Sequence, residues 1–363
     1  MTTLQSNLLE NHTPTGREEA WRFTPLKRLA GLHDGTATPV ARKSLAAKGS
    51  LPAGVEFTFG EISAVTTTDD AIVNRVRAFA SEGATLSIAA NTEVAEPIFL
   101  NRCVGGVSEA ELSRVKIELK EHARATIVIE NTGDALIAED LEIVLKPGSH
   151  LTFISLQEWG SKTVHAARHH AIVDRDATFK SIVVTVGGDV VRLLPTVDFI
   201  APGASCDLQG VYFASEGQFF EHRMFVDHKV PNAKSRVNYK GALAGKDAHT
   251  VWIGDVFIRA AAEGTDTYEL NRNLLLTDGA RADSVPNLEI ETGEIIGAGH
   301  ASTTGRFDDE QLFYLMSRGI NIDDARRLVV RGFFNEVISL IGIEEVQDRL
   351  MARIDGELAK VAH

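Results

Sequence analysis

The chain has few cysteines and no long apolar run, and each absence excludes a class of protein. Its two cysteines, Cys103 and Cys206, are far apart in a chain of 363 residues and form no Cys-x-x-Cys spacing. The sequence therefore predicts buried structural thiols, and neither a disulfide framework nor a metal cluster held by this chain's thiolates alone. No segment approaches the roughly 18 apolar residues of a membrane span, and the N-terminus lacks a basic start followed by an apolar run. We expect a cytoplasmic protein with no membrane partner.

Basic residues are scarce relative to acidic ones. The chain has 37 Lys and Arg against 50 Asp and Glu, which gives a formal net charge of −13. Because nucleic acids bind mainly through Lys and Arg, this balance argues against nucleic acid as a partner. A phosphate-binding loop requires Gly-x4-Gly-Lys-(Ser/Thr), and the nearest string, residues 243–247, lacks the first glycine and the hydroxyl after Lys246. We therefore expect no ATPase activity in this chain.

Short β-rich runs are abundant in the middle of the chain. Between residues 98 and 291, alternating apolar and polar positions predict strands with one buried face. The clearest runs are residues 125–130, 140–145, 151–156, 181–186, 196–200 and 249–254. Turn residues such as Pro202 and Gly203 separate them. The pattern fits a sandwich, a barrel or a β-helix, and periodicity alone does not choose among the three.

Both ends of the chain have helical patterns. The N-terminal helices are expected at residues 17–23, 25–30 and 69–81. After residue 305 we expect three amphipathic helices, the first capped by Asp308 and the second beginning near Asn321. They should form a compact satellite with its own core, which includes Leu328. The predicted regions are 1–97, a mixed helical region; 98–305, the β-rich core; and 306–363, a helical domain.

Residues 284–320 are the most specific part of the sequence. They combine a strand-like Pro-x-Leu-Glu-Ile run from Pro286, a lone His300 among small residues, and the string DEQLFYLMSRGI at residues 309–320. This combination resembles the SufB/SufD family of iron-sulfur cluster assembly proteins. The resemblance implies a mainly β fold with helical ends, in which a right-handed parallel β-helix core is flanked by an N-terminal helical region and a C-terminal helical domain.

Two features favour the SufD branch of this family over the SufB branch. Residues 18–26, EEAWRFTPL, are similar to the Trp-Arg-(Tyr/Phe)-Thr segment of SufD. SufB has a cysteine, implicated in holding the nascent cluster, where this chain has Ala282. A SufB-like paralogue is an alternative that Ala282 disfavours. A β-helix carbohydrate-active enzyme is a more remote one, because three Trp and four Tyr are few for sugar-stacking platforms.

The resemblance also implies a function. Proteins of the SufD branch are non-catalytic scaffold subunits that pair with SufB and dock the ATPase SufC on their helical domain. ATP would be bound by the SufC partner only. The expected cofactor is a transient iron-sulfur cluster shared with SufB, and the complex can also accommodate reduced flavin. A homodimer is expected when SufB is absent.

His300 is the candidate cluster ligand. By resemblance it would bind iron together with a partner cysteine, and imidazole nitrogen does ligate iron-sulfur centres. We expect it in the turn that closes the last β-coil. The candidate partner-binding residues in the helical domain are Phe313, Arg318, Phe333 and Phe334. Since adjacent helical residues point about 100° apart, we expect Phe333 in the core of the satellite and Phe334 toward SufC.

The remaining histidines have more ordinary interpretations. His222 and His228 lie six residues apart, hence on one face of a strand, where a hydrogen-bonded ladder is favoured over metal ligation. His165, His169 and His170 are expected on a solvated surface, because a His-x3-His spacing suits zinc only on a helix.

Overall fold

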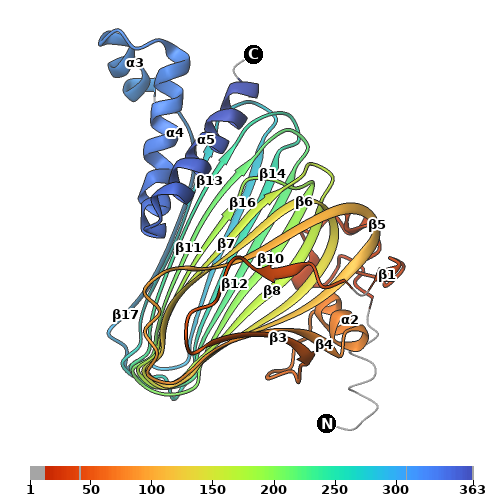
Figure 1. Cartoon of the computed structure of the whole chain (residues 1–363). Helices are drawn as coiled ribbons and strands as arrows, with labels where there is room; N and C mark the ends of the chain where they lie inside the picture. Colours follow the sequence, from red (N-terminus) through yellow and green to blue (C-terminus); the bar gives the residue numbers. More distant parts are fainter. Residues whose placement is uncertain (1–12, 41, 308, 362–363) are drawn as a thin grey trace.

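The structure, a computed structural model, describes residues 13–40, 42–307 and 309–361. Most of these residues form a parallel β-helix, in which the chain winds in flattened coils stacked on one another (Figure 1). Helices occur only toward the two ends of the described chain. The expected mainly β fold, with a parallel β-helix between helical ends, is confirmed.

Within the described residues there are seventeen strands. They are β1 (Pro39–Val40), β2 (Leu45–Ala47), β3 (Val55–Glu61), β4 (Glu82–Ile88), β5 (Ile98–Leu119), β6 (Arg124–Leu145), β7 (His150–Trp159), β8 (Val164–Val173), β9 (Thr178–Thr185), β10 (Val190–Phe199), β11 (Ser205–Ala214), β12 (Phe219–His228), β13 (Lys234–Leu243), β14 (His249–Ile258), β15 (Asp266–Leu275), β16 (Arg281–Ile290) and β17 (Gly297–Arg306). All six predicted runs overlap these strands.

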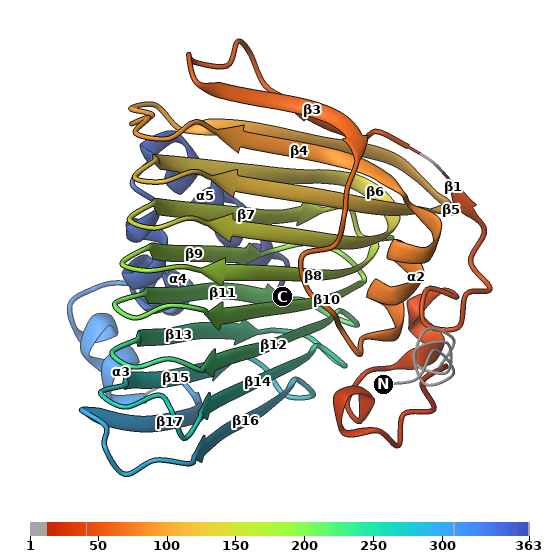
Figure 2. The same ribbon diagram turned by 90° about the horizontal axis from the view of Figure 1, so that it is seen from below.

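Two parallel sheets face each other across the interior of the coils. Sheet A contains the second halves of β5 and β6, followed by β8, β10, β12, β14 and β16. Sheet B contains the first halves of β5 and β6, followed by β7, β9, β11, β13, β15 and β17. Each strand therefore pairs with the corresponding strand of the next coil, as Figure 2 shows from below.

Alternation along each strand sends every second side chain into the interior. Most inward side chains are apolar and fully buried, such as Phe199 and Trp252. Several inward polar side chains pair with one another. The Tyr212 hydroxyl donates to Asn273 Oδ1 (2.6 Å), and Asn271 Nδ2 donates to the Tyr212 hydroxyl (3.0 Å). Such pairing offsets the cost of removing polar groups from water.

The N-terminal segment covers the outer face of sheet A. Its first two elements, η1 (Glu19–Trp21) and η2 (Leu26–Leu29), are single 3-10 turns where we predicted short helices. Trp21 is buried, with the Arg192 guanidinium carbon 3.9 Å from its ring centroid. The predicted helix at residues 69–81 is confirmed as α2 (Ala71–Phe79).

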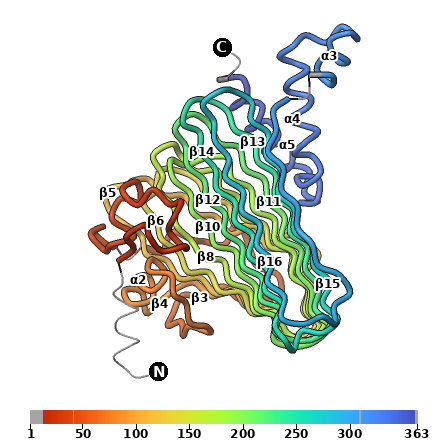
Figure 3. Tube along the Cα trace, turned by 180° about the vertical axis from the view of Figure 1, so that it is seen from behind, coloured from red at the N-terminus to blue at the C-terminus, as the bar shows by residue number. Residues whose placement is uncertain are grey.

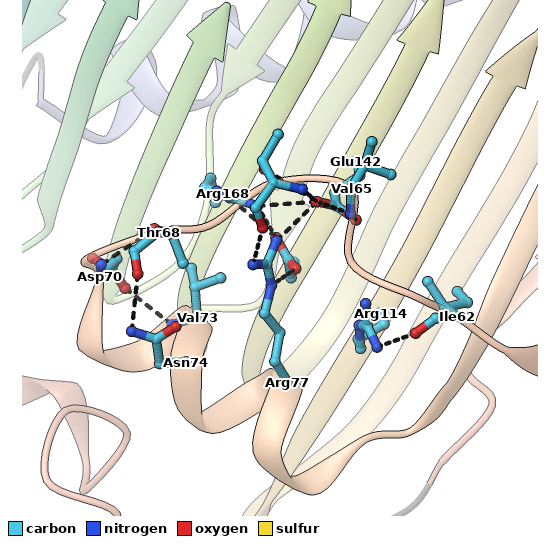
Figure 4. Close-up of polar contacts among 12 residues, drawn as sticks. Ile62, Val65, Thr68, Asp70, Val73, Asn74, Arg77, Arg114, Glu142 and Arg168 are labelled. Atoms are coloured by element: carbon cyan, nitrogen blue, oxygen red, sulfur yellow. Dashed lines mark hydrogen bonds and ion pairs between the residues drawn. The ribbon is translucent and has the colours of Figure 1, made fainter. Parts of the chain in front are cut away.

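Ion pairs attach α2 to sheet A. Arg77 on α2 donates from Nε to Asp140 Oδ2 (2.6 Å) and from Nη2 to Glu142 Oε1 (2.8 Å). Arg168 on β8 pairs with the same Asp140 from the neighbouring coil (Nη2 to Oδ1, 2.9 Å). Figure 4 shows Arg77, Arg168 and Glu142 meeting beside the loop that carries Val65. Both carboxylates are almost fully buried, so the positive charges of the two arginines are needed to stabilise their negative charges.

The C-terminal helices cover the outer face of sheet B. They are α3 (Asp309–Ser317), α4 (Ile322–Ile338), η3 (Ser339–Ile341) and α5 (Glu344–Val361). The helix expected to begin near Asn321 is confirmed as α4, and Asn321 caps it, its side chain accepting from the Asp324 N–H. Asp308, the predicted cap of the preceding helix, lies outside the described residues. Figure 3 shows α4 and α5 along one side of the coil stack, opposite the N-terminal segment, with α3 projecting beyond it.

The expectation of a compact helical satellite with its own core is wrong. The apolar side chains of α4 and α5 pack instead on outward apolar residues of sheet B, in a cluster that includes Ile154, Ile182, Val211, Phe334, Val337 and Leu350. Leu328, predicted to be buried, is 48% exposed. Two helices alone would leave one side of this cluster open to water, and the sheet closes it.

Removing the Arg77 side chain should destabilise the fold. Arg77→Ala leaves Asp140 and Glu142 buried with Arg168 as the arginine still in ion-pair contact with them, so we expect the free energy of unfolding to fall by about 3 kcal/mol. Arg327→Ala is the matched control, because its pair with Asp324 is about half exposed on both sides and should change stability by less than about 1 kcal/mol. Chemical denaturation measures both, and equal losses in the two variants would contradict this assignment.

The buried histidines should make the fold sensitive to acid. Burial lowers the pKa of His169 and His228 to about 4 and that of His170 and His222 to about 3, and it also lowers the pKa of His165. The unfolded chain binds protons at these side chains below about pH 6.5, whereas the folded chain binds them only at lower pH. Because the folded protein buries these histidines in the neutral form, it gains stability relative to the unfolded chain above about pH 6.5. This stability is lost as the pH falls toward 4.

His228→Gln tests this dependence at one position, because the amide keeps a polar group near Ser235 and does not titrate. The melting temperature of the variant relative to wild type should rise as pH is lowered from 7 to 5. A difference between the two proteins that does not change with pH would contradict the expectation.

Candidate functional site

The last coil of the β-helix leaves one edge open. In the part of the chain that the structure describes, β16 pairs only with β14, and β17 pairs only with β15. Residues along both strands are half-buried or exposed, unlike those of the preceding coils. In Figure 2 this coil lies at the blue end of the stack. Its free N–H and C=O groups form an edge on which another chain can pair.

His300 lies within β17, and the prediction that it sits in a closing turn is wrong. Residues 291–296 form that turn, and the strand begins at Gly297. The His300 side chain is 44% exposed, and its Nδ1 lies 3.7 Å from Oε1 of Glu269, its register partner on β15. A histidine in this position belongs to the inward row of the last coil and still reaches the open end.

Glu269 is a functional candidate that the sequence analysis did not identify. The residue is 1% exposed, and neither carboxyl oxygen has a hydrogen-bond partner among the described residues. A Cβ at Gly254, across the interior on β14, would come within 2.2 Å of Glu269 Oε2, so only glycine leaves room for this carboxyl. Burial, with a smaller contribution from Asp255, raises the pKa of Glu269 to about 8. Glu269 could be recognised as a candidate only from its position in the inward row of β15, and the sequence does not show which face of that strand points inward.

Hydroxyl and amide groups line the interior beside this pair. Ser302 donates to Ser284 Oγ (2.7 Å), and Ser284 donates to Asn271 Oδ1 (2.8 Å). Ala282 occupies the inward row of β16, so no thiol is present at that point of the open coil. Within the described ranges, no three His, Cys, Asp or Glu side chains are grouped to hold a metal ion. A metal ion bound at His300 would therefore need further ligands from a partner or from solvent.

The five other histidines discussed above, His165, His169, His170, His222 and His228, are buried in the β-helix. His222 and His228 lie in β12, where His222 stacks on Tyr212 with ring centroids 5.0 Å apart, so the structural interpretation holds. The prediction that His165, His169 and His170 lie on a solvated surface is wrong. All three are at most 5% exposed, because both faces of β8 are covered.

The two cysteines differ in exposure. Cys206 is buried on the inward side of β11, as predicted, and burial raises the pKa of its thiol. Cys103 is exposed, so the prediction that it is a buried thiol is wrong. Its neighbours Arg102 and Val104 in β5 occupy the buried inward positions, which turns the Cys103 side chain outward.

The candidate partner residues of the helical region divide into exposed and buried groups. Phe313 is 73% exposed, and Arg318, also exposed, has its guanidinium carbon 4.7 Å from the ring centroid of Tyr314. Phe334 is fully buried against sheet B, which contradicts its assignment to a partner surface. Phe333 is partly buried, with Lys240 Nζ 4.8 Å from its ring centroid. The prediction for Phe334 is wrong because sheet B completes the core of α4, whereas the partly buried Phe333 also packs against this core.

Comparisons with known proteins identify the family. Residues 102–333 match the model for the SUF system FeS cluster assembly SufBD core domain. An iron-sulfur cluster assembly SufBD family protein of Mycobacterium tuberculosis is 46% identical over 354 residues, covering 95% of this chain and 89% of that protein. A SufBD family protein of Mycobacterium leprae is 45% identical over 358 residues, covering 95% and 90%. The SufD protein of Escherichia coli is 25% identical over 385 residues, covering 97% and 90%.

Fold and sequence therefore agree on the class. The molecule is a two-sheet parallel β-helix whose last coil is open and bears a half-exposed histidine. The chain belongs to the SufBD family of iron-sulfur cluster assembly proteins.

Proposed function

We propose that this chain is the SufD-type scaffold subunit of an iron-sulfur cluster assembly complex. The observation that carries the proposal is the open last coil, in which an unpaired strand edge and His300 occur together. The similarity to the Escherichia coli SufD protein along 97% of the chain and the presence of Ala282 in place of the SufB cysteine support the SufD branch. The chain itself would catalyse no reaction.

The open coil is the surface proposed to pair with SufB. Strands β16 and β17 offer backbone groups for pairing, and the buried stack behind them keeps that edge rigid. In the joined complex His300 would meet a SufB cysteine, and the two would hold the iron of a transient cluster that is cargo of the complex. The same edge accounts for a homodimer when SufB is absent. We also infer a cytoplasmic location; among the described residues, no helix has the length and apolar character of a membrane span.

The helical tip is the surface proposed to dock SufC. Exposed apolar side chains gather on α3 and the start of α4, namely Phe313, Tyr314, Met316 and Leu328. Monomeric proteins rarely expose such groups together unless a partner covers them. ATP would be bound by SufC alone, and reduced flavin, where present, would belong to the complex.

Changing His300 to Ala should impair cluster formation without preventing assembly. The complex reconstituted with SufB and SufC should elute intact in size-exclusion chromatography, yet its iron and sulfide content should fall by about tenfold or more. His150→Ala, at a partly exposed histidine in β7, is the control and should behave as wild type. A wild-type cluster content in the His300 variant would rule out the ligand role.

Changing Phe313 to Ala should weaken SufC binding. A large aromatic at an interface centre is a common anchor, so we expect a loss of roughly 2 kcal/mol in the free energy of binding. Phe59→Ala removes an exposed aromatic from β3, away from the helical tip, and should leave SufC affinity unchanged. Calorimetric titration with SufC distinguishes the two variants; equal affinities for wild type and Phe313→Ala would mean that the ATPase docks elsewhere.

A further inference from the structure

Glu269 occupies a place that packing alone does not explain. Its register neighbours are Val237 in the preceding coil and His300 in the next, and Gly254 and Trp252 face it across the interior. The carboxyl has no hydrogen-bond partner among the described residues, although it is almost fully buried. Burying such a group unpaired costs several kcal/mol, and an apolar residue would avoid that cost. The nearby polar side chain of the next coil is His300, at the open end.

We propose that Glu269 and His300 together form a half-site for ferrous iron at the open end of the β-helix, with one carboxylate oxygen and one imidazole nitrogen as ligands. This inference rests on the proposed function, which supplies iron as cargo. It assigns a second ligand from this chain and defines the donor set as mixed nitrogen and oxygen. The remaining coordination positions face the open end, where a partner chain and water can supply donors.

The geometry fits one ion between the two side chains. Two donor atoms that each lie about 2.1 Å from a metal are roughly 3.0 Å apart at a right angle and roughly 3.4 Å apart at the tetrahedral angle. The separation of 3.7 Å between His300 Nδ1 and Glu269 Oε1 closes to this range with a movement of a few tenths of an ångström. Imidazole and carboxylate are donors that suit divalent iron.

The surroundings favour this use of the carboxyl. Gly254 leaves the space that the carboxyl occupies, and the half-exposed His300 ring gives an ion access from the open end. When the oxygen binds the ion, the proton held by the carboxyl leaves to solvent, and no electron is transferred. The strand pairing on β15 and β17 fixes both Cα positions, so the two ligands are arranged before the ion arrives.

The test is anaerobic titration of the purified full-length chain with Fe²⁺ alone, and with Co²⁺ as a spectroscopic probe, without SufB or SufC. Glu269→Gln keeps the shape and the hydrogen-bonding capacity of the side chain but removes the anionic oxygen. We expect both Glu269→Gln and His300→Ala to weaken binding of the ion by about tenfold or more and to reduce the visible Co²⁺ bands. The control Glu289→Gln removes an exposed carboxylate from the same coil and should bind as wild type.

A second variant tests the site without replacing either proposed ligand. Gly254→Ala keeps Glu269 but places a methyl group where the carboxyl lies, so it should also weaken ion binding in protein that remains folded by thermal melting. If Glu269→Gln binds like wild type while His300→Ala does not, the half-site is wrong and the role of His300 in the proposed function stands. If neither Glu269→Gln nor His300→Ala changes the binding of the ion, or if the wild-type chain binds none, the inference is wrong. The cluster content of the reconstituted His300 variant then tests the proposed function separately.

Discussion

Parallel backbone pairing between successive coils is the constraint on which the rest of the structure depends. From β10 through β12 and β14 to β16, residues pair in register from one coil to the next. In such a stack the first coil and the last coil each have strands with one unpaired edge. At the N-terminal end, β1, β2 and β4 pair with β5 and cover much of that edge. At the other end β16 and β17 have no such cover among the described residues, so the open edge follows from the architecture itself.

The same pairing arranges side chains in rows that run through the stack. An inward row tolerates polar groups when they bond to one another, as Tyr212, Asn271 and Asn273 do. Glu269 departs from this rule, because its coil neighbours offer it only Val237 on one side and His300 on the other. A buried carboxyl group with neither oxygen hydrogen-bonded is a reason to look for function at that position.

Both flanking segments are held to the β-helix by apolar packing and by ion pairs. Apolar side chains such as Trp21 and Ile72 pack the N-terminal segment on sheet A, and ion pairs at Arg77 and Arg192 add to this contact. Phe334 and Val337 likewise pack α4 on sheet B, and the ion pair between Lys240 and Glu336 adds to that contact. The projecting α3 lies outside this apolar contact and exposes Phe313. A partner that moves α3 would therefore act on α4, and through α4 on sheet B.

The sequence by itself determined the strand runs, the start of a helix near Asn321 and the motif around His300, because these depend on local alternation, local helix-start signals and residue identity. Which face of each strand is buried was decided only by the tertiary structure. His165 and Cys103 were misassigned for that reason, and Phe334 was misassigned because sheet B, distant in sequence, completes the core of α4. Glu269 and His300 are brought together only by the length of one coil and the register of β15 on β17. No local sequence pattern predicts that contact, since it depends on the number of residues between one coil and the next.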